Sequence, residues 1–475
     1  MTDWADTSLC AVAEALAAGK VTSREILESC LDRTRRLNPL LNAFIDYDLD
    51  GAIAAADRAD KALKRGCRPG PLHGIPLAHK DMYYRAGRAS SCGSRLRADR
   101  LQSTTATVLE RLDHAGAIET GRLVMVEFAL GPHGYNANYP LCRNIWNPDH
   151  IPCGSSSGSG VAVSAGMIFG SLGSDTGGSI RCPAAVSGVV GIAPTYGRVS
   201  RSGVMPMSFS LDVVGPLARR VRDCARLLSI IAGRDNADST SLDVPVPDYE
   251  AGLDAPGPLP RIGVARGYFD EGVHPSIASA LADAADAFRR SGFAVDEVAM
   301  PADDLSEIAE LHPLVMKAEG AANHLNEMRA DPNGYTPEVR NRLQAGFFIP
   351  ATDYIQALKL RGTYLRSFAR AVFDKADIVM TPVLAAPTPT IDETMNTQGT
   401  AYLAMVTRLT RNTKVINYLG LPAISVPCGF ADNGLPVAFQ LIGRPLAEAQ
   451  LLSAAHRYEQ VARWYETTPP LARAA

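Results

Sequence analysis

The stretch GSSSGSG at residues 154–160 limits what this chain can fold into, because an apolar segment comes directly after it. The next residues, VAVSAGMIFGSL (161–172), are small and apolar, which is typical of a buried helix. A flexible Gly-Ser linker joins parts that move independently, and it does not run straight into a buried segment. The pattern therefore predicts that the stretch is packed inside a domain and leads into a buried helix.

Two chemical interpretations of the same stretch are also open. A phosphate-binding loop of the Walker type needs G-K-[ST], which is absent, and the glycine spacing differs from G-x-G-x-x-G. Residues 154–158 do fit G-x-S-x-G, the nucleophile elbow of α/β-hydrolases, with Ser156 as nucleophile and His456 as a distant partner. That motif needs a strand directly before it, whereas RNIWNPDHIPC contains two prolines. An esterase that uses Ser156 is therefore only an alternative.

Helical and strand patterns alternate along the chain. Amphipathic spacing predicts helices over residues 5–65 and over most of 303–375. Short apolar runs such as PRIGVARG, ADIVMTPV, LPAISVPCGF and PVAFQLIGRP predict buried strands. This alternation favours an α/β fold with a central sheet, and no clear linker divides the chain into independent domains.

Composition excludes several classes of function. The net charge of −3 provides no basic field for nucleic acid and no polybasic anchor for a membrane. The sequence contains no run of about 18 uncharged apolar residues, so we expect no membrane-spanning helix. The nine cysteines are scattered without C-x-x-C spacing, and the histidines form no H-E-x-x-H pattern. We therefore expect reduced cytosolic thiols and no metal site.

A second Gly-Ser segment, GSDTGGSIRCPAA (173–185), suggests acyl-transfer chemistry. In a tight glycine turn the backbone N–H groups of Thr176, Gly177, Gly178 and Ser179 can converge on an anion, as an oxyanion hole requires. Upstream, HGIPLAHKD places Lys80 beside apolar residues. Burial disfavours the charged form of a lysine, so Lys80 is a candidate neutral base.

Three segments together resemble the amidase signature family. They are GPLHGIPLAHKD, PCGSSSGSGVAVSAG and GSDTGGSIRCPAAVSGVVGIAPTYGRVSRSG, in the family's order and spacing, and the resemblance returns over 415–460. It implies one domain over 1–475 with a mixed sheet flanked by helices on both faces. The parts are N-terminal helices (1–70), a catalytic core (71–235), a variable pocket region (236–410) and a C-terminal return to the core (411–475).

The resemblance also implies a Ser-Ser-Lys triad. Position by position, Ser179 matches the nucleophile, Ser155 the bridging serine with a cis peptide bond, and Lys80 the base. Residues 176–179 match the oxyanion hole. Asp175 and Arg181 match a charged pair that supports this turn. Amide hydrolysis would then proceed through an acyl-enzyme, with neither a metal nor an organic cofactor.

Two residues depart from the family's G-G-S-S-G-G pattern. Cys153 replaces the first glycine, and Ser157 replaces a later one. We interpret Cys153 as a small packed residue rather than a catalytic thiol. Ser156 and Ser157 are expected to hydrogen-bond the loop and to open the following helix.

The substrate is less constrained. Some family members are the A subunits of glutamyl-tRNA amidotransferases, in which an Asp before the NLAGLP-like segment binds glutamine; here Thr410, Arg411 and Asn412 provide no acid. We therefore expect a small aryl or apolar amide, anilide or substituted urea, and a glutaminase component of such an amidotransferase is the alternative. A homodimer is implied by the family alone. Aromatic and apolar residues near the motifs are candidates for the substrate pocket, namely Met82, Tyr83, Tyr135 and Phe209.

Overall fold

The computed structural model describes residues 3–473, and its centre is a mixed sheet of eight strands in the order β4-β6-β5-β10-β11-β9-β7-β8. Neighbouring strands are antiparallel except at β7, which is parallel to β8 and to β9. The inner strands are buried on both faces, which is why they are near-continuous apolar runs. The strands are β4 (Gly170–Asp175), β5 (Val190–Ala193), β6 (Val213–Ala218), β7 (Ile262–Arg266), β8 (Val295–Ala299), β9 (Ile378–Pro382), β10 (Ala423–Phe430) and β11 (Pro436–Gly443).

A smaller sheet adjoins the edge of the large one. Its strands run in the order β1 (Phe44–Tyr47), β3 (Ile118–Leu123) and β2 (Pro76–Lys80). The amide of Phe169 donates to the carbonyl of Pro76 at 3.2 Å, and the amide of Leu172 donates to Nδ1 of His79 at 3.1 Å. These contacts place the end of β2 beside β4, so the two strands deliver side chains to one place.

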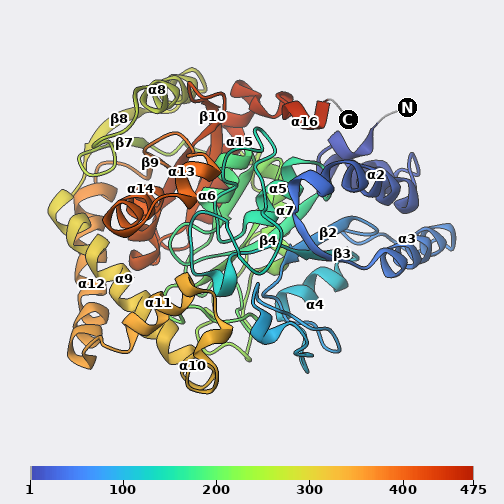
Figure 1. Cartoon of the computed structure of the whole chain (residues 1–475). Coiled ribbons are helices and arrows are strands. Elements are labelled where there is room, and N and C mark those ends of the chain that lie inside the picture. Colours follow the sequence, from blue (N-terminus) through green and yellow to red (C-terminus); the bar gives the residue numbers. More distant parts are fainter. Residues whose placement is uncertain (1–2, 474–475) are drawn as a thin grey trace.

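Helices cover both faces of the large sheet. The helices of the variable region, α9, α11 and α12, lie together on one side of the molecule, and α2 and α3 lie on the opposite side (Figure 1). The helices are α1 (Leu9–Ala17), α2 (Ser23–Leu41), α3 (Leu49–Lys64), α4 (Thr107–His114), α5 (Ser157–Ser164), α6 (Arg181–Ser187), α7 (Val221–Ile231), α8 (Pro275–Arg290), α9 (Ala302–Asn323), α10 (Leu325–Ala330), α11 (Pro337–Gly346), α12 (Ala351–Phe373), α13 (Ile391–Met395), α14 (Gly399–Leu419), α15 (Glu448–Ala462) and α16 (Pro470–Arg473).

The fold confirms the predicted α/β class and the single large domain, and β7, β9, β10 and β11 lie in the four apolar runs. Two elements differ from the prediction. β1 interrupts the N-terminal helices, and α14 forms where no helix was expected. The sequence of α14 is rich in threonine and other residues of modest helix propensity, so packing of its buried C-terminal half stabilises it. Among residues 3–473 no helix is long and apolar enough to cross a membrane.

Candidate active site

Lys80 is the last residue of β2 and is 1% exposed. Its Nζ donates to Oγ of Ser155 at 2.7 Å and to Oγ of Ser174 at 2.8 Å. Burial lowers the pKa of Lys80 to about 7, although the carboxylates of Asp212 and Asp175 act to raise it. A substantial fraction of this amine is therefore neutral near pH 7, so it can accept a proton.

The Gly-Ser stretch forms the other side of this contact. The Gly154–Ser155 peptide bond is cis, and the amide of Gly154 donates to the carbonyl of Pro132 at 2.7 Å. α5 begins at Ser157 and packs so closely that a Cβ on Gly158 would lie 2.3 Å from the Ala43 carbonyl oxygen. The stretch is therefore packed as predicted, and it is not a linker.

The structure contradicts the nucleophile-elbow alternative. Residues 151–153, directly before the stretch, form no strand, and the strand that precedes it in the chain is β3, which ends at Leu123. The Ser156 hydroxyl is fully buried and lies 3.4 Å from the Ser174 carbonyl oxygen. His456 lies on α15, with Nε2 3.3 Å from Asp254. A serine in this setting has neither the exposed turn nor the histidine that the motif requires.

The turn that follows β4 is closed by a buried ion pair. Arg181 donates to Oδ1 of Asp175 at 3.0 Å, and both side chains are almost completely buried. The same carboxylate accepts the amides of Gly178 at 2.7 Å and Ile180 at 3.1 Å. Burial acts to raise the pKa of Asp175, but the charge and hydrogen bonds of Arg181 outweigh it and lower the pKa to about 2. The carboxylate is therefore ionised and organises the turn.

Residues from the C-terminal part of the chain attach this turn to the sheet. Arg181 also donates to Oε1 of Gln440 at 2.8 Å and to the carbonyl of Thr413 at 3.1 Å, and it bonds to the side chain of Asn417. Gln440 lies on β11, and the other two residues lie on α14. The return of the chain to the core thus determines where the turn is placed.

Ser179 lies in the turn between β4 and α6 and is half-buried. Within residues 3–473 its hydroxyl has no hydrogen-bond partner. Of the four candidate oxyanion donors, the amide of Gly178 donates to Oδ1 of Asp175. The amides of Thr176, Gly177 and Ser179 donate to no acceptor in the described chain. These three N–H groups are the ones available to an anion.

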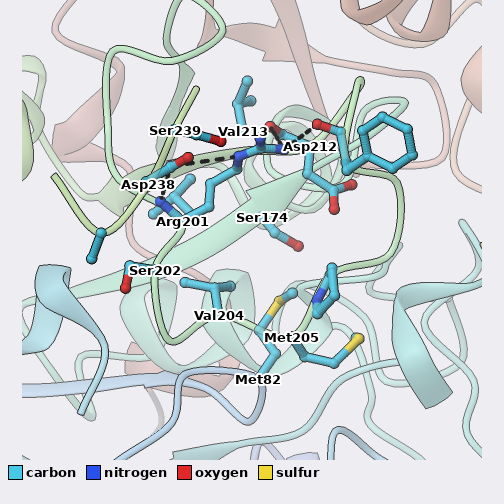
Figure 2. Close-up of a pocket in the computed structure, with 14 residues that line it drawn as sticks. Met82, Ser174, Arg201, Ser202, Val204, Met205, Asp212, Val213, Asp238 and Ser239 are labelled. Carbon is cyan, nitrogen blue, oxygen red and sulfur yellow. Dashed lines mark hydrogen bonds and ion pairs between the residues drawn. The ribbon is translucent and has the colours of Figure 1, made fainter. Parts of the chain in front are cut away.

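A cavity of about 270 Å³ reaches Ser174, the second partner of Lys80. Met82, Val204 and Met205 line one side, and Arg201, Asp212 and Asp238 line the other, with Ser174 between them (Figure 2). Met82 and Phe209, two of the four candidate pocket residues, line this cavity.

The other two predicted pocket residues are not among those that line this cavity. Tyr83 is buried, and its hydroxyl donates to the Gly173 carbonyl at 2.6 Å, so it belongs to the core beside β4. Tyr135 lies near His133, to whose Nδ1 its amide donates at 3.0 Å. All four residues lie near motif segments in the sequence, and that position could not separate these tyrosines from Met82 and Phe209. The direction of a side chain is set by packing.

Ser174 is the site residue that sequence reasoning missed. It precedes Asp175 on β4, and successive side chains of a strand point to opposite faces. Asp175 faces the turn and Arg181, so Ser174 faces Lys80. The segment GSDTGG contained a hint of this role. Ser174 is next to an aspartate expected to be buried, so on a strand its own side chain points to the opposite face and needs a polar partner there.

Residues 25–452 match the sequence profile of the family described as Amidase. This chain belongs to the amidase family. The amidase is 38% identical to the A subunit of glutamyl-tRNA(Gln) amidotransferase from Chloroflexus aggregans, with the whole of both chains aligned. It is 37% identical to the corresponding protein of Pseudomonas aeruginosa over 97% of this chain and 98% of that one. Family membership makes it an amide-cleaving or amidotransferase enzyme of the amidohydrolase type.

Solved structures agree with the family. The amidase superimposes with a TM-score of 0.89 and 30% identity on a structure titled "An unexpected vestigial protein complex reveals the evolutionary origins of an s-triazine catabolic enzyme", over 96% of this chain and 98% of that chain. It superimposes with a TM-score of 0.83 and 30% identity on the native peptide amidase of Stenotrophomonas maltophilia, over 98% and 99%. Two solved structures at 30% identity therefore share this fold over nearly the whole chain.

Proposed function

We propose that the amidase cleaves a linear carboxylic amide through an acyl-enzyme on Ser179, with Ser155 and Lys80 as its proton relay. The observation that carries this proposal is the 2.7 Å hydrogen bond between Lys80 and Ser155 in a buried setting. An amide carbon is a weak electrophile, so the serine that attacks it needs an adjacent base. A lysine with a pKa lowered to about 7 meets that need near neutral pH.

The proposed reaction needs no reactant besides the amide substrate and water. Neutral Lys80 accepts the proton of Ser155 while Ser155 accepts the proton of Ser179, whose oxygen bonds to the substrate carbonyl carbon. The negative charge on the carbonyl oxygen is stabilised by free N–H groups of the turn. Collapse breaks the C–N bond, and the proton returns through Ser155 to the leaving amine. Water then hydrolyses the ester by the same relay.

For the substrate we propose a small aryl or apolar amide, anilide or substituted urea. The cavity beside Ser174 has an apolar wall formed by Met82, Val204 and Met205. On the opposite wall the guanidinium of Arg201 lies 3.9 Å from Asp238 and donates to the Phe209 carbonyl at 2.6 Å. The charge of Arg201 is thus already paired, so the cavity favours a neutral ligand.

A second candidate is the glutaminase component, the A subunit, of a glutamyl-tRNA amidotransferase. It is favoured by identities of 37–39% to such proteins over nearly the whole length of both chains. The side chains on α14 favour the first candidate instead. Thr410 and Asn412 are neutral, and Arg411 is basic and pairs with Glu271, so these three positions provide no acid for the amino group of glutamine.

The first experiment is reaction with a fluorophosphonate, followed by intact mass and peptide mapping. Label on Ser179 is expected, and label on another serine would contradict the acyl-enzyme. The purified chain is then assayed with neutral anilides, with ureas and with glutamine. Turnover of anilides by the chain alone supports the first candidate. Glutamine turnover that needs the other amidotransferase subunits supports the second.

Two further proposals follow from the same chain. All nine cysteines are unpaired thiols, which supports a reducing, cytosolic compartment. The homodimer is tested by sedimentation of the same preparation, where a monomer would contradict it.

A further inference from the structure

His312 lies on α9 in the variable region, far from the signature segments in sequence, and it is almost fully buried. Its Nε2 is 2.8 Å from the carbonyl oxygen of Thr176, a residue 136 positions earlier in the chain. Because a carbonyl can only accept, this nitrogen carries the proton and donates. α9 packs against α14, so both helices lie over the turn that contains Ser179.

Side chains from outside the turn hold three successive carbonyl groups of its backbone. A trans peptide is planar, with its N–H directed opposite to its C=O. Holding one carbonyl therefore sets the direction of the following N–H. The pairs are Asn417 Nδ2 to the Asp175 carbonyl at 3.0 Å, His312 Nε2 to the Thr176 carbonyl at 2.8 Å, and Thr413 Oγ1 to the Gly177 carbonyl at 2.6 Å.

The same two side chains explain both glycines of the turn. A Cβ on Gly177 would come within 3.1 Å of Cε1 of His312, so the imidazole leaves little room for a side chain there. A Cβ on Gly178 would come within 2.2 Å of Oγ1 of Thr413, and φ of Gly178 is +125°. His312 and Thr413 thus pack directly on the backbone that carries the candidate oxyanion donors.

His312 is a neutral donor in this setting. Burial lowers the pKa of His312 to about 4, while the carbonyl of Thr176 acts to raise it. Lys414 and Arg181 act to lower it and Asp175 to raise it, so charges of both signs surround the ring. Its N–H donor is present in both protonation states, which makes the contact independent of pH across the neutral range.

We propose that His312 is a positioning residue that directs the Gly177 N–H at the oxyanion of the reaction. The inference rests on the proposed acyl-enzyme and adds to it a residue from the variable region. Thr413 acts in the same way on the next peptide, where it keeps the Gly178 N–H on Asp175 and off the substrate. The signature segment thus supplies the donor, and α9 supplies its direction.

The test compares His312→Met with His312→Gln, which have similar length and differ in the N–H donor. The readout is the rate constant for covalent labelling of Ser179 by a fluorophosphonate at saturating probe, which does not depend on knowing the substrate. We expect His312→Met to label roughly 10- to 100-fold more slowly, because a misdirected oxyanion donor loses most of its effect. His312→Gln should stay within about threefold of the wild type, and probe affinity should change little in both.

Thr413→Val and Thr413→Ser form a second pair that keeps the inference testable if the His312 variants do not fold. Thr413→Val is nearly isosteric and loses the hydroxyl that holds the Gly177 carbonyl. The backbone of Gly177, whose N–H is the proposed oxyanion donor, is then free to turn, so labelling should slow, whereas Thr413→Ser should resemble the wild type. Wild-type rates in both His312→Met and Thr413→Val would overturn the inference, as would His312→Gln being as slow as His312→Met. Absence of label on Ser179 in the wild type would instead contradict the proposed function itself.

Discussion

The candidate relay and the turn that carries Ser179 are built in different ways. Lys80, Ser155 and Ser174 all come from the signature core, and their hydrogen bonds join residues of that core to one another. The turn that carries Ser179 is held by residues of α9, α14 and β11. One half of the site is thus organised within the motif segments, and the other depends on chain that comes much later in the sequence.

The two halves place different demands on the chain: the relay depends on which side-chain groups are present, and the turn depends on where its backbone N–H groups point. The proposed relay needs an amine beside a hydroxyl, and the core alone brings Lys80 and Ser155 to a distance of 2.7 Å. The turn needs backbone N–H groups with a defined direction, and direction is set by the groups that hold the opposite carbonyls.

The largest effect is expected from breaking the relay at its base. Lys80→Met removes the proton acceptor and keeps the apolar length, so kcat/KM should fall by roughly 1,000-fold or more. The exposed Lys375→Met serves as a matched control and should leave the rate unchanged. Steady-state kinetics on an active anilide measures both. Near wild-type activity of Lys80→Met would remove lysine from the mechanism.

The pH profile tests the same group without a mutation. Only neutral Lys80 can accept a proton, and its pKa is lowered to about 7. The value of kcat/KM should therefore be low in acid, where the amine is protonated, and should rise with pH through a midpoint near 7. A flat profile between pH 6 and 9 would contradict this assignment.

Breaking the turn at its ion pair should affect stability first. Arg181→Met leaves Asp175 buried without its partner, which typically costs about 3–5 kcal/mol of unfolding free energy. Arg33→Met is the matched control, because Arg33 is similarly buried but its partners Asp3 and Asp6 are exposed to water. Arg33→Met should therefore lower the unfolding free energy less than Arg181→Met does. Urea denaturation measures both.

Acid adds a second test of the ion pair. The pKa of Asp175 is lowered to about 2, so its contribution to stability is present above about pH 4 and is lost as pH falls towards 2. That acid-dependent loss should be smaller in Arg181→Met, in which the pKa of Asp175 is no longer lowered by the guanidinium. An identical pH dependence in both proteins would contradict the assignment.

Ser174→Ala tests how much the proposed relay depends on the second hydroxyl that binds Lys80. It removes one of the two hydroxyls that orient Lys80 and leaves the bond to Ser155. One lost hydrogen bond of this kind corresponds to about 1–2 kcal/mol, so kcat should fall roughly 10-fold, far less than in Ser155→Ala. Equal losses in the two alanine variants would mean that Ser174 transfers protons itself.

The smallest effect is expected at Cys153. Its backbone φ is +53°, which disfavours an L-residue by roughly 1–2 kcal/mol, and burial raises the pKa of its thiol, so the thiolate is disfavoured. Cys153→Gly relieves the backbone but loses packing, so stability should change by about 1 kcal/mol or less and activity by about twofold or less. Cys153→Ala should be less stable than Cys153→Gly. A loss of activity beyond about 100-fold in both would indicate a catalytic thiol.

Much of the fold could be predicted from local patterns. The apolar runs at β7, β9, β10 and β11 predicted strands because a strand buried on both faces needs a continuous apolar segment. α14 was missed because its residues favour a helix only weakly, and its stability comes from burial against distant elements. Tyr83 was placed in the pocket and lies in the core, since nothing local sets the direction of a ring.

The residue types of the motif segments already specify the chemical groups of the site, namely an amine at Lys80, hydroxyls at Ser155 and Ser179, and a glycine turn. The partners of these groups follow from the fold and not from the motifs. The fold paired Ser174 with Lys80 and assigned the Gly178 amide to Asp175. Buried polar groups form hydrogen bonds with the groups that packing places beside them. Packing joins residues that are far apart in the chain, and no local sequence pattern marks such pairs.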